Sequence, residues 1–253
     1  MRPSTASLAG VVLLCTATLA LAGEPVLANF RFYGFVPVDR DASRVQIAIA
    51  KQATTLAVAL TACRRNGVRG VLKADAVDVE ACMATAYGRF TEHTADLDAV
   101  ACITPALQNE LGTFFKDYAV SFDPILWCDG SEPLPDGFSG GFVPTANVYR
   151  TESAVSRKLM DYGRDISSCV QRAMARLVAG RAPELEACLA TARADADASM
   201  LRGQLSRRIA GLEPDDCLKG ANDVAAALDA IANLAPNLSE AVFCETPESP
   251  PPN

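Results

Sequence analysis

The sequence predicts an all-α fold made of two tandem copies of a three-helix, disulfide-stapled unit. Two observations support this prediction. A pattern of cysteines and short strings recurs along the chain, and apolar residues fall at steps of three and four, as on one face of an α-helix. No stretch alternates apolar and polar residues for long enough to predict a strand. The residues thus indicate an architecture and leave the biochemical function open.

The first 22 residues have the pattern of a secretory signal peptide. Arg2 precedes an apolar stretch over residues 8–21, and A-L-A at 20–22 provides a small-residue cleavage site before Gly23. That stretch is too short for a membrane span, and no later run reaches the required length. We therefore expect a secreted protein, extracellular or periplasmic, that loses residues 1–22 and has no transmembrane span.

Removal of the signal peptide also removes Cys15 and leaves an even number of cysteines. These are Cys63, Cys82, Cys102, Cys128, Cys169, Cys188, Cys217 and Cys244. An even number in an exported chain favours disulfides, because the systems that reduce thiols are cytosolic. The spacings lack the C-x₂₋₄-C pairs of zinc sites and the C-x-x-C-H motif of haem attachment. We expect no metal ion and no other cofactor.

The cysteines fall into two sets of four with matching intervals. Cys63 and Cys82 are 19 residues apart, and so are Cys169 and Cys188. E-A-C-M-A-T-A at 80–86 matches E-A-C-L-A-T-A at 186–192, and G-F-V-P at 34–37 recurs at 141–144. The predicted organisation is an aromatic arm (23–33), repeat 1 (34–128), a Gly/Pro linker (129–140), repeat 2 (141–244) and a Pro-rich disordered tail (245–253).

Each repeat is predicted to contain three helices. The first begins just after G-F-V-P, and its apolar face contains Val45, Ile49, Ala53, Leu56, Leu60 and Cys63 in repeat 1, and Val148, Val155, Leu159, Tyr162, Ile166, Cys169 and Ala173 in repeat 2. The second begins near Val79 and near Leu185, where Asp78, Glu80, Glu184 and Glu186 suit the positive end of the helix dipole. The third contains Leu107, Leu111, Phe114 and Tyr118 in repeat 1, and Cys217, Ala221, Val224, Leu228 and Ile231 in repeat 2.

Two details of these helices stay open. R-R-N-G at 64–67 has the pattern of a basic last turn with a glycine stop, whereas the matching segment of repeat 2 keeps its helical periodicity to Val178. Repeat 2 also has extra residues around 194–208, which we expect to lengthen a helix or a loop.

The helices restrict how the cysteines can pair. Cys82 lies in the first turns of the second helix and Cys102 beyond its far end, roughly 20 Å or more away, whereas bridged Cα atoms are about 4.4–6.8 Å apart. The same argument excludes a bridge between Cys188 and Cys217. Cys63 and Cys82 flank the turn of a helical hairpin, so we predict that they pair, as do Cys169 and Cys188. The pairs Cys102–Cys128 and Cys217–Cys244 follow by elimination.

No arrangement of residues predicts catalysis. The single histidine, His93, is expected to be a solvated residue at the end of a helix. The candidate acid pairs are Asp195 with Asp197, Asp215 with Asp216, and Glu80 with Glu186, and such spacings are common on surfaces. G-F-S-G-G at 137–141 lacks the strand that a nucleophile elbow needs. We expect no enzymatic activity, and a carboxylate-dependent hydrolase remains an alternative.

The net charge and the aromatic residues indicate which classes of partner to expect. A net charge of −7 and a pI near 4.8 argue against nucleic acid. Phe30, Phe32, Tyr33 and Phe35 form either a recognition site for a partner or a clasp over the helices. Asn237 begins a glycosylation sequon, which has meaning only in a eukaryotic host. We expect an exported, non-catalytic binding or structural module with an unknown protein partner, or, as an alternative, a carrier of a small apolar ligand or lipid.

Overall fold

The computed structural model describes residues 37, 39–95, 97, 110, 113, 127, 145–202, 204–211 and 221–243. Over these residues the chain forms six helices and no strand, so the prediction of an all-α fold is confirmed. The helices are α1 (Arg40–Lys73), α2 (Val79–Ala95), α5 (Ala146–Val178), α6 (Leu185–Leu201), α7 (Gln204–Ile209) and α8 (Ala221–Val242).

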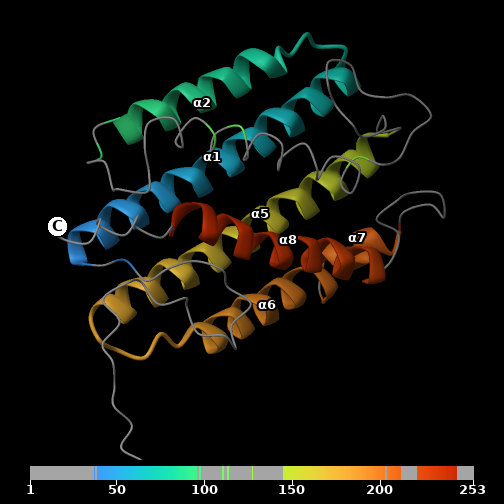
Figure 1. Cartoon of the computed structure of the whole chain (residues 1–253). Coiled ribbons are helices and arrows are strands. Elements are labelled where there is room, and N and C mark those ends of the chain that lie inside the picture. Colours follow the sequence, from blue (N-terminus) through green and yellow to red (C-terminus); the bar gives the residue numbers. More distant parts are fainter. Residues whose placement is uncertain are drawn as a thin grey trace, which may run out of the picture.

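The two long helices, α1 and α5, form the centre of the molecule and pack against each other (Figure 1). On their outer sides, α2 packs against α1 and α6 packs against α5, each as an antiparallel neighbour (Figure 1). Helix α8 packs mainly against α5 and also contacts α1 and α6. The short connections after α1 and α5 account for the antiparallel hairpins.

Helices α1, α2, α5 and α6 begin where the sequence predicts. The Asp39 carboxylate accepts hydrogen bonds from the backbone N–H groups of Asp41 and Ala42 at 2.9 and 2.8 Å and thereby caps α1. Thr145 caps α5 in the same way. Such caps satisfy backbone donors that have no partner within the helix.

The second helices differ in their first turns. Asp78 accepts a hydrogen bond from Ala81 N–H at 2.8 Å, in agreement with the predicted role of that carboxylate at α2. Glu184 does not cap α6, because its carboxylate pairs instead with Arg176 at 2.5 Å and its backbone is left-handed, with φ 53°.

The R-R-N-G segment does not end α1. The helix continues to Lys73, and Ala74 ends it in a left-handed conformation with φ 54°. Gly67 is buried within the helix. A Cβ at Gly70 would lie 2.5 Å from a Val77 methyl group, so this glycine allows the turn to fold back closely. The glycines therefore serve packing, and periodicity gave the better prediction of the helix end.

Arg64 is likewise not an exposed residue of a last turn. Its side chain is buried, and it donates a long hydrogen bond to the sulfur of Met83 on α2. Burial lowers the pKa of Arg64 to about 10, because a low-polarity environment disfavours the charged form.

The predicted apolar faces form the core. All seven predicted residues of α5 are buried, as are five of the six in α1, where Val45 is half-buried. In α8, Val224, Leu228 and Ile231 are buried. The predicted third helix of the first half is described only at Glu110 and Thr113, which are helical. The aromatic residues before the last cysteine of each set, Trp127 and Phe243, are also buried. These residues form one continuous core across both helical pairs.

The interface between α1 and α5 contains polar residues that the sequence did not reveal. Thr54 and Ser167 share a hydrogen bond of 2.7 Å, and the Thr61 hydroxyl donates to the sulfur of Met160 at 3.3 Å. Further buried polar residues on these two helices are Ser43, Gln46, Thr151, Glu152, Ser153 and Ser156. Hydroxyls that bond their own helix or the facing one can be buried at low cost.

In the second half, the residues after α6 include a short helix, whereas the matching residues after α2 lie mostly outside the described part of the chain. Helices α2 and α6 both have 17 residues, so α6 is not lengthened, and the short helix α7 follows it. Arg193 on α6 bonds Asp197 at 3.0 Å, Asp229 on α8 at 2.6 Å, and the Tyr162 hydroxyl on α5. This network ties α5, α6 and α8 together.

Among the described residues, α1 is the one helix whose length and composition would suit a membrane span, with a mean hydropathy of 1.3 over its most apolar window. Core helices of soluble proteins meet the same criterion. Helix α1 packs against α2 on one side and α5 on the other (Figure 1). Its apolar face therefore contacts protein.

Candidate functional site

One disulfide connects each long helix to its shorter neighbour. Cys63 pairs with Cys82 and Cys169 with Cys188, both at a Cα–Cα distance of 5.7 Å. These are two of the four pairs that the spacing predicts. Disulfides are compatible with an oxidising compartment outside the cytosol.

Several predicted features lie outside the described residues. They are the signal peptide, the linker, the Pro-rich tail, the aromatic residues Phe30, Phe32, Tyr33 and Phe35, and the cysteines Cys102, Cys128, Cys217 and Cys244. The pairs Cys102–Cys128 and Cys217–Cys244 and the role of the aromatic arm therefore stay predictions.

A pocket of about 530 Å³ lies between α1 and α2, and we call it the α1–α2 pocket. Its floor consists of Leu56, Phe90 and the Cys63–Cys82 disulfide. The side chains of Leu56 and Phe90 are at most 3% exposed. The small side chains of Ala59, Ala62 and Ala86 line its walls. The pocket exists because alanine on both helices leaves space where larger side chains would fill the hairpin.

The rim of the pocket is polar. On α1 it contains Gln52, Thr55 and Asn66, and on α2 it contains Thr85, Arg89 and His93. Within the described lining, Arg89 and His93 are the only side chains that can carry a charge, and both are exposed. The rim can therefore offer hydrogen bonds and positive charge to a molecule whose apolar part contacts the floor.

The polar groups are arranged along the length of the pocket. Because α1 and α2 are antiparallel, residues at equal distances from the disulfide lie across from each other (Figure 1). Gln52 and His93 are each 11 residues from their cysteine, or roughly 16 Å along the helix. The two ionisable side chains thus lie toward the end away from the disulfide.

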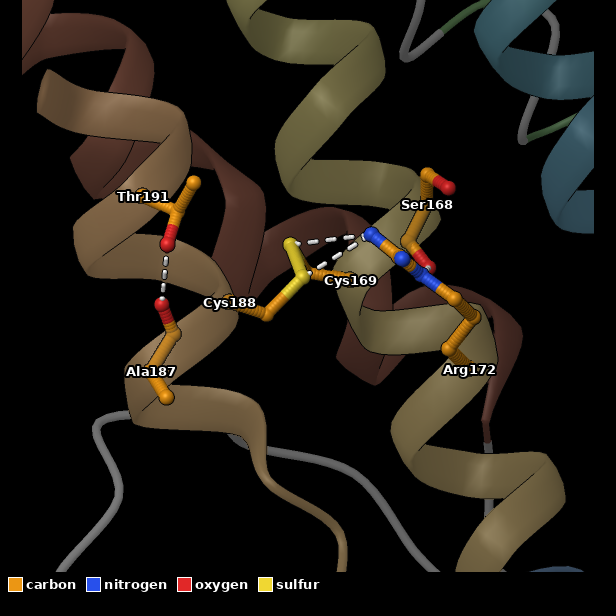
Figure 2. Close-up of a disulfide and its surroundings, with 6 residues drawn as sticks. All are labelled: Ser168, Cys169, Arg172, Ala187, Cys188 and Thr191. Carbon is orange, nitrogen blue, oxygen red and sulfur yellow. Dashed lines mark hydrogen bonds between the residues drawn. A yellow bond between two sulfur atoms is a disulfide. The ribbon is translucent and has the colours of Figure 1, made fainter. Parts of the chain in front are cut away.

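The same face of the α5–α6 pair has a different character. At the interval of 106 residues that separates Cys63 from Cys169, the residues corresponding to Gln52, Thr55, Ala59 and Asn66 are Lys158, Asp161, Asp165 and Arg172. Lys158 and Asp161 form an ion pair at 3.7 Å. Arg172 lies over the disulfide and donates to Cys188 Sγ at 2.9 Å (Figure 2). Charged side chains therefore cover this face where α1 presents uncharged ones.

The predicted catalytic candidates do not converge in the described part of the chain. Asp195 is exposed on α6, whereas Asp197 is paired with Arg193. Glu80 and Glu186 are exposed in the first turns of α2 and α6, on separate hairpins. No group of three or more potential metal ligands occurs among the described residues. Asp215 and Asp216 lie outside them, and Asn237 lies within α8.

No known protein family, no curated protein and no solved structure matches this chain. The α1–α2 pocket itself was not predicted from the sequence. The periodicity of α1 identifies Leu56 and Cys63 as buried, but it does not indicate that the alanines beside them border open space. The difference in charge between the matching positions of α1 and α5 is a sequence signal that could have located this face.

Proposed function

We propose that the protein is an exported, non-catalytic binding module, secreted or periplasmic, that holds a small apolar ligand in the α1–α2 pocket. The observation that supports this best is the combination of an apolar floor and a polar rim in one pocket of about 530 Å³. Sites for small molecules have volumes of about 300–1,000 Å³ and combine apolar walls with few polar groups. Of the functions that the sequence left open, this favours ligand binding.

The disulfide supports a binding role for the pocket. Cys63 and Cys82 join the two helices that form its walls, and Cys63 is buried. A cross-link of this kind limits how far α1 and α2 can close on each other or separate. A preformed pocket loses less conformational entropy on binding, and more of the contact energy then appears as affinity.

We also propose that the two hairpins are tandem copies of one unit. Helices α1 and α5 have 34 and 33 residues, and both disulfides span 19 residues. At the interval of 106 residues, Thr54 corresponds to Met160 and Thr61 corresponds to Ser167. Thr54 contacts Ser167 and Thr61 contacts Met160, so each threonine contacts the counterpart of the other. Such reciprocal contacts are typical of an interface between two copies related by a twofold axis.

If the hairpins are duplicates, the pocket face of α1 can be compared with the matching face of α5. If the copies began alike, four positions on the pocket face of α1 are uncharged where their counterparts on α5 are charged. A charged wall would have to be desolvated by an apolar ligand, at a cost that an uncharged wall does not impose. The difference between the copies supports specialisation of the first hairpin for an apolar ligand, with the second as a structural partner.

The test is binding of a neutral apolar fluorophore, N-phenylnaphthylamine, to the mature protein. Ala59→Phe places a large side chain in the pocket, and Ala84→Phe places the same side chain on the exposed face of α2, outside the pocket. We expect the wild type and Ala84→Phe to enhance the fluorescence in a saturable manner, and Ala59→Phe to bind at least about tenfold more weakly. Circular dichroism establishes that both variants fold.

Equal binding by the two folded variants would place the fluorophore elsewhere and contradict the proposal. An absence of saturable binding to the wild type would contradict it as well. Solvent extraction of protein purified from its native source, followed by mass spectrometry, adds an independent test, because a carrier should release a small apolar molecule.

A further inference from the structure

We infer that the ligand of the α1–α2 pocket is a single-chain amphiphile with a carboxylate head group. The carboxylate is held at Arg89 and His93, and the chain runs along the floor toward the Cys63–Cys82 disulfide. This inference rests on the proposed function and specifies the ligand that the pocket takes.

The charge of the rim identifies the head group. The whole chain carries a net charge of −7, yet the ionisable side chains that line this pocket are an arginine and a histidine. Glu92 neighbours His93 in the sequence but does not line the pocket. Arg89 forms no ion pair with any described residue, so its guanidinium is available to a ligand. A local positive charge on an acidic protein selects for an anion.

The type of cation favours a carboxylate. A guanidinium presents two parallel N–H donors that match the two oxygens of a carboxylate. One permanent cation balances one negative charge, which corresponds to the single charge of a carboxylate. The side-chain amide of Gln52 can donate a further hydrogen bond to the head at the same end of the pocket, whereas the Thr55 hydroxyl already donates to the Lys51 carbonyl at 2.9 Å.

The floor of the pocket determines the direction in which the alkyl chain of the ligand runs and how many alkyl chains the ligand has. From the level of His93 to the disulfide, over roughly 16 Å, the apolar part of the lining includes Phe90, Leu56, Ala86 and Ala59, and Arg89 and Thr85 are part of the rim beside it. These side chains offer apolar contact without charge, which suits an alkyl chain. The pocket is bounded by a single pair of helices and measures about 530 Å³, so one chain is the fitting occupant.

The experiment compares three ligands with the same chain and different heads, namely dodecanoate, dodecanol and dodecyltrimethylammonium. Each ligand is titrated, below the concentration at which it forms micelles, against N-phenylnaphthylamine bound to the full mature protein. The measurement is the displacement of the fluorophore. We expect dodecanoate to bind about tenfold more tightly than dodecanol, as one charge-assisted interaction provides, and the cationic ligand to bind most weakly.

The matched variants are Arg89→Met, Arg89→Lys and Arg69→Met, because Arg69 is exposed on α1 and does not line the pocket. Arg89→Met should bring dodecanoate to the affinity of dodecanol and leave dodecanol unchanged. Arg89→Lys should restore part of the preference, and Arg69→Met should retain all of it.

The failures are distinguishable. If dodecanol and dodecanoate bind equally to the wild type, the head-group inference is wrong while the apolar site stands. The same holds if Arg89→Met and Arg69→Met weaken dodecanoate alike, since that indicates general attraction to positive charge. If none of the three ligands displaces the fluorophore, the inference and the proposed function are both overturned.

Discussion

Removal of the Cys63–Cys82 disulfide is the most direct perturbation of the first hairpin. The double substitution Cys63→Ala/Cys82→Ala opens a loop with a sequence separation of 19 residues. The chain-entropy relation gives about 11 cal/mol/K for such a loop, or about 3 kcal/mol at 25 °C. Since Cys63 is buried, loss of its sulfur from the core adds a smaller packing cost.

The second hairpin provides the matched comparison. The Cys169–Cys188 disulfide has the same separation and the same Cα–Cα distance of 5.7 Å, so its removal should cost the same entropy. In addition, Arg172 donates to Cys188 Sγ at 2.9 Å, and loss of this contact should add up to about 1 kcal/mol. We therefore expect Cys169→Ala/Cys188→Ala to be the more destabilising of the two double substitutions.

The measurement is reversible urea unfolding followed by far-ultraviolet circular dichroism, with the free energy of unfolding extrapolated to water. Peptide mapping without reduction first verifies that the remaining cysteines have not exchanged partners. A loss below about 1 kcal/mol for Cys63→Ala/Cys82→Ala would refute the reasoning, because the unfolded chain would then gain little freedom from the open loop.

Four further predictions follow from particular residues. Ala74→Gly should stabilise the protein by about 1 kcal/mol in urea unfolding, because Ala74 ends α1 with φ 54°; an unchanged midpoint would contradict this. Burial raises the pKa of Tyr162, so the unfolded chain loses this proton first and stability falls as pH rises through the ordinary value of about 10. Tyr162→Phe should lessen that fall between about pH 9 and pH 11, and an equal fall in both proteins would argue against it. Ser156→Ala should be neutral or stabilising by up to about 1 kcal/mol, since the Ser156 hydroxyl is buried and has no hydrogen-bond partner among the described residues, whereas a clear loss in melting temperature would indicate that it has one. Peptide mapping should link Cys102 to Cys128, and a link from either to another cysteine would overturn the pairing scheme.

Much of the fold could be predicted because its signals are local. The apolar period of α5, from Val148 to Ala173, marks a buried face without reference to any other element. Asp39 and Thr145 mark the helix starts by the bonds that their own side chains make to nearby backbone. The interval of 19 residues between cysteines, placed on a hairpin, restricts the bridge to one neighbour.

The features that the sequence did not reveal depend on neighbours distant in the chain. R-R-N-G has the composition of a helix end, yet burial of Arg64 and Gly67 keeps it helical. Gln46 and Glu152 are polar residues, yet both are buried in the folded chain. In each case tertiary packing outweighs a local preference of less than about 1 kcal/mol per residue.

The sequence by itself determined the all-α class, the helix starts and which cysteines pair across each hairpin, because these depend on residues a few turns apart. Tertiary structure alone decided that α1 and α2 enclose a pocket and that Arg89 and His93 line it. Whether an alanine such as Ala59 borders another side chain or open space depends on the distance between two helices. That distance is set by the packing of the whole hairpin, which no single segment encodes.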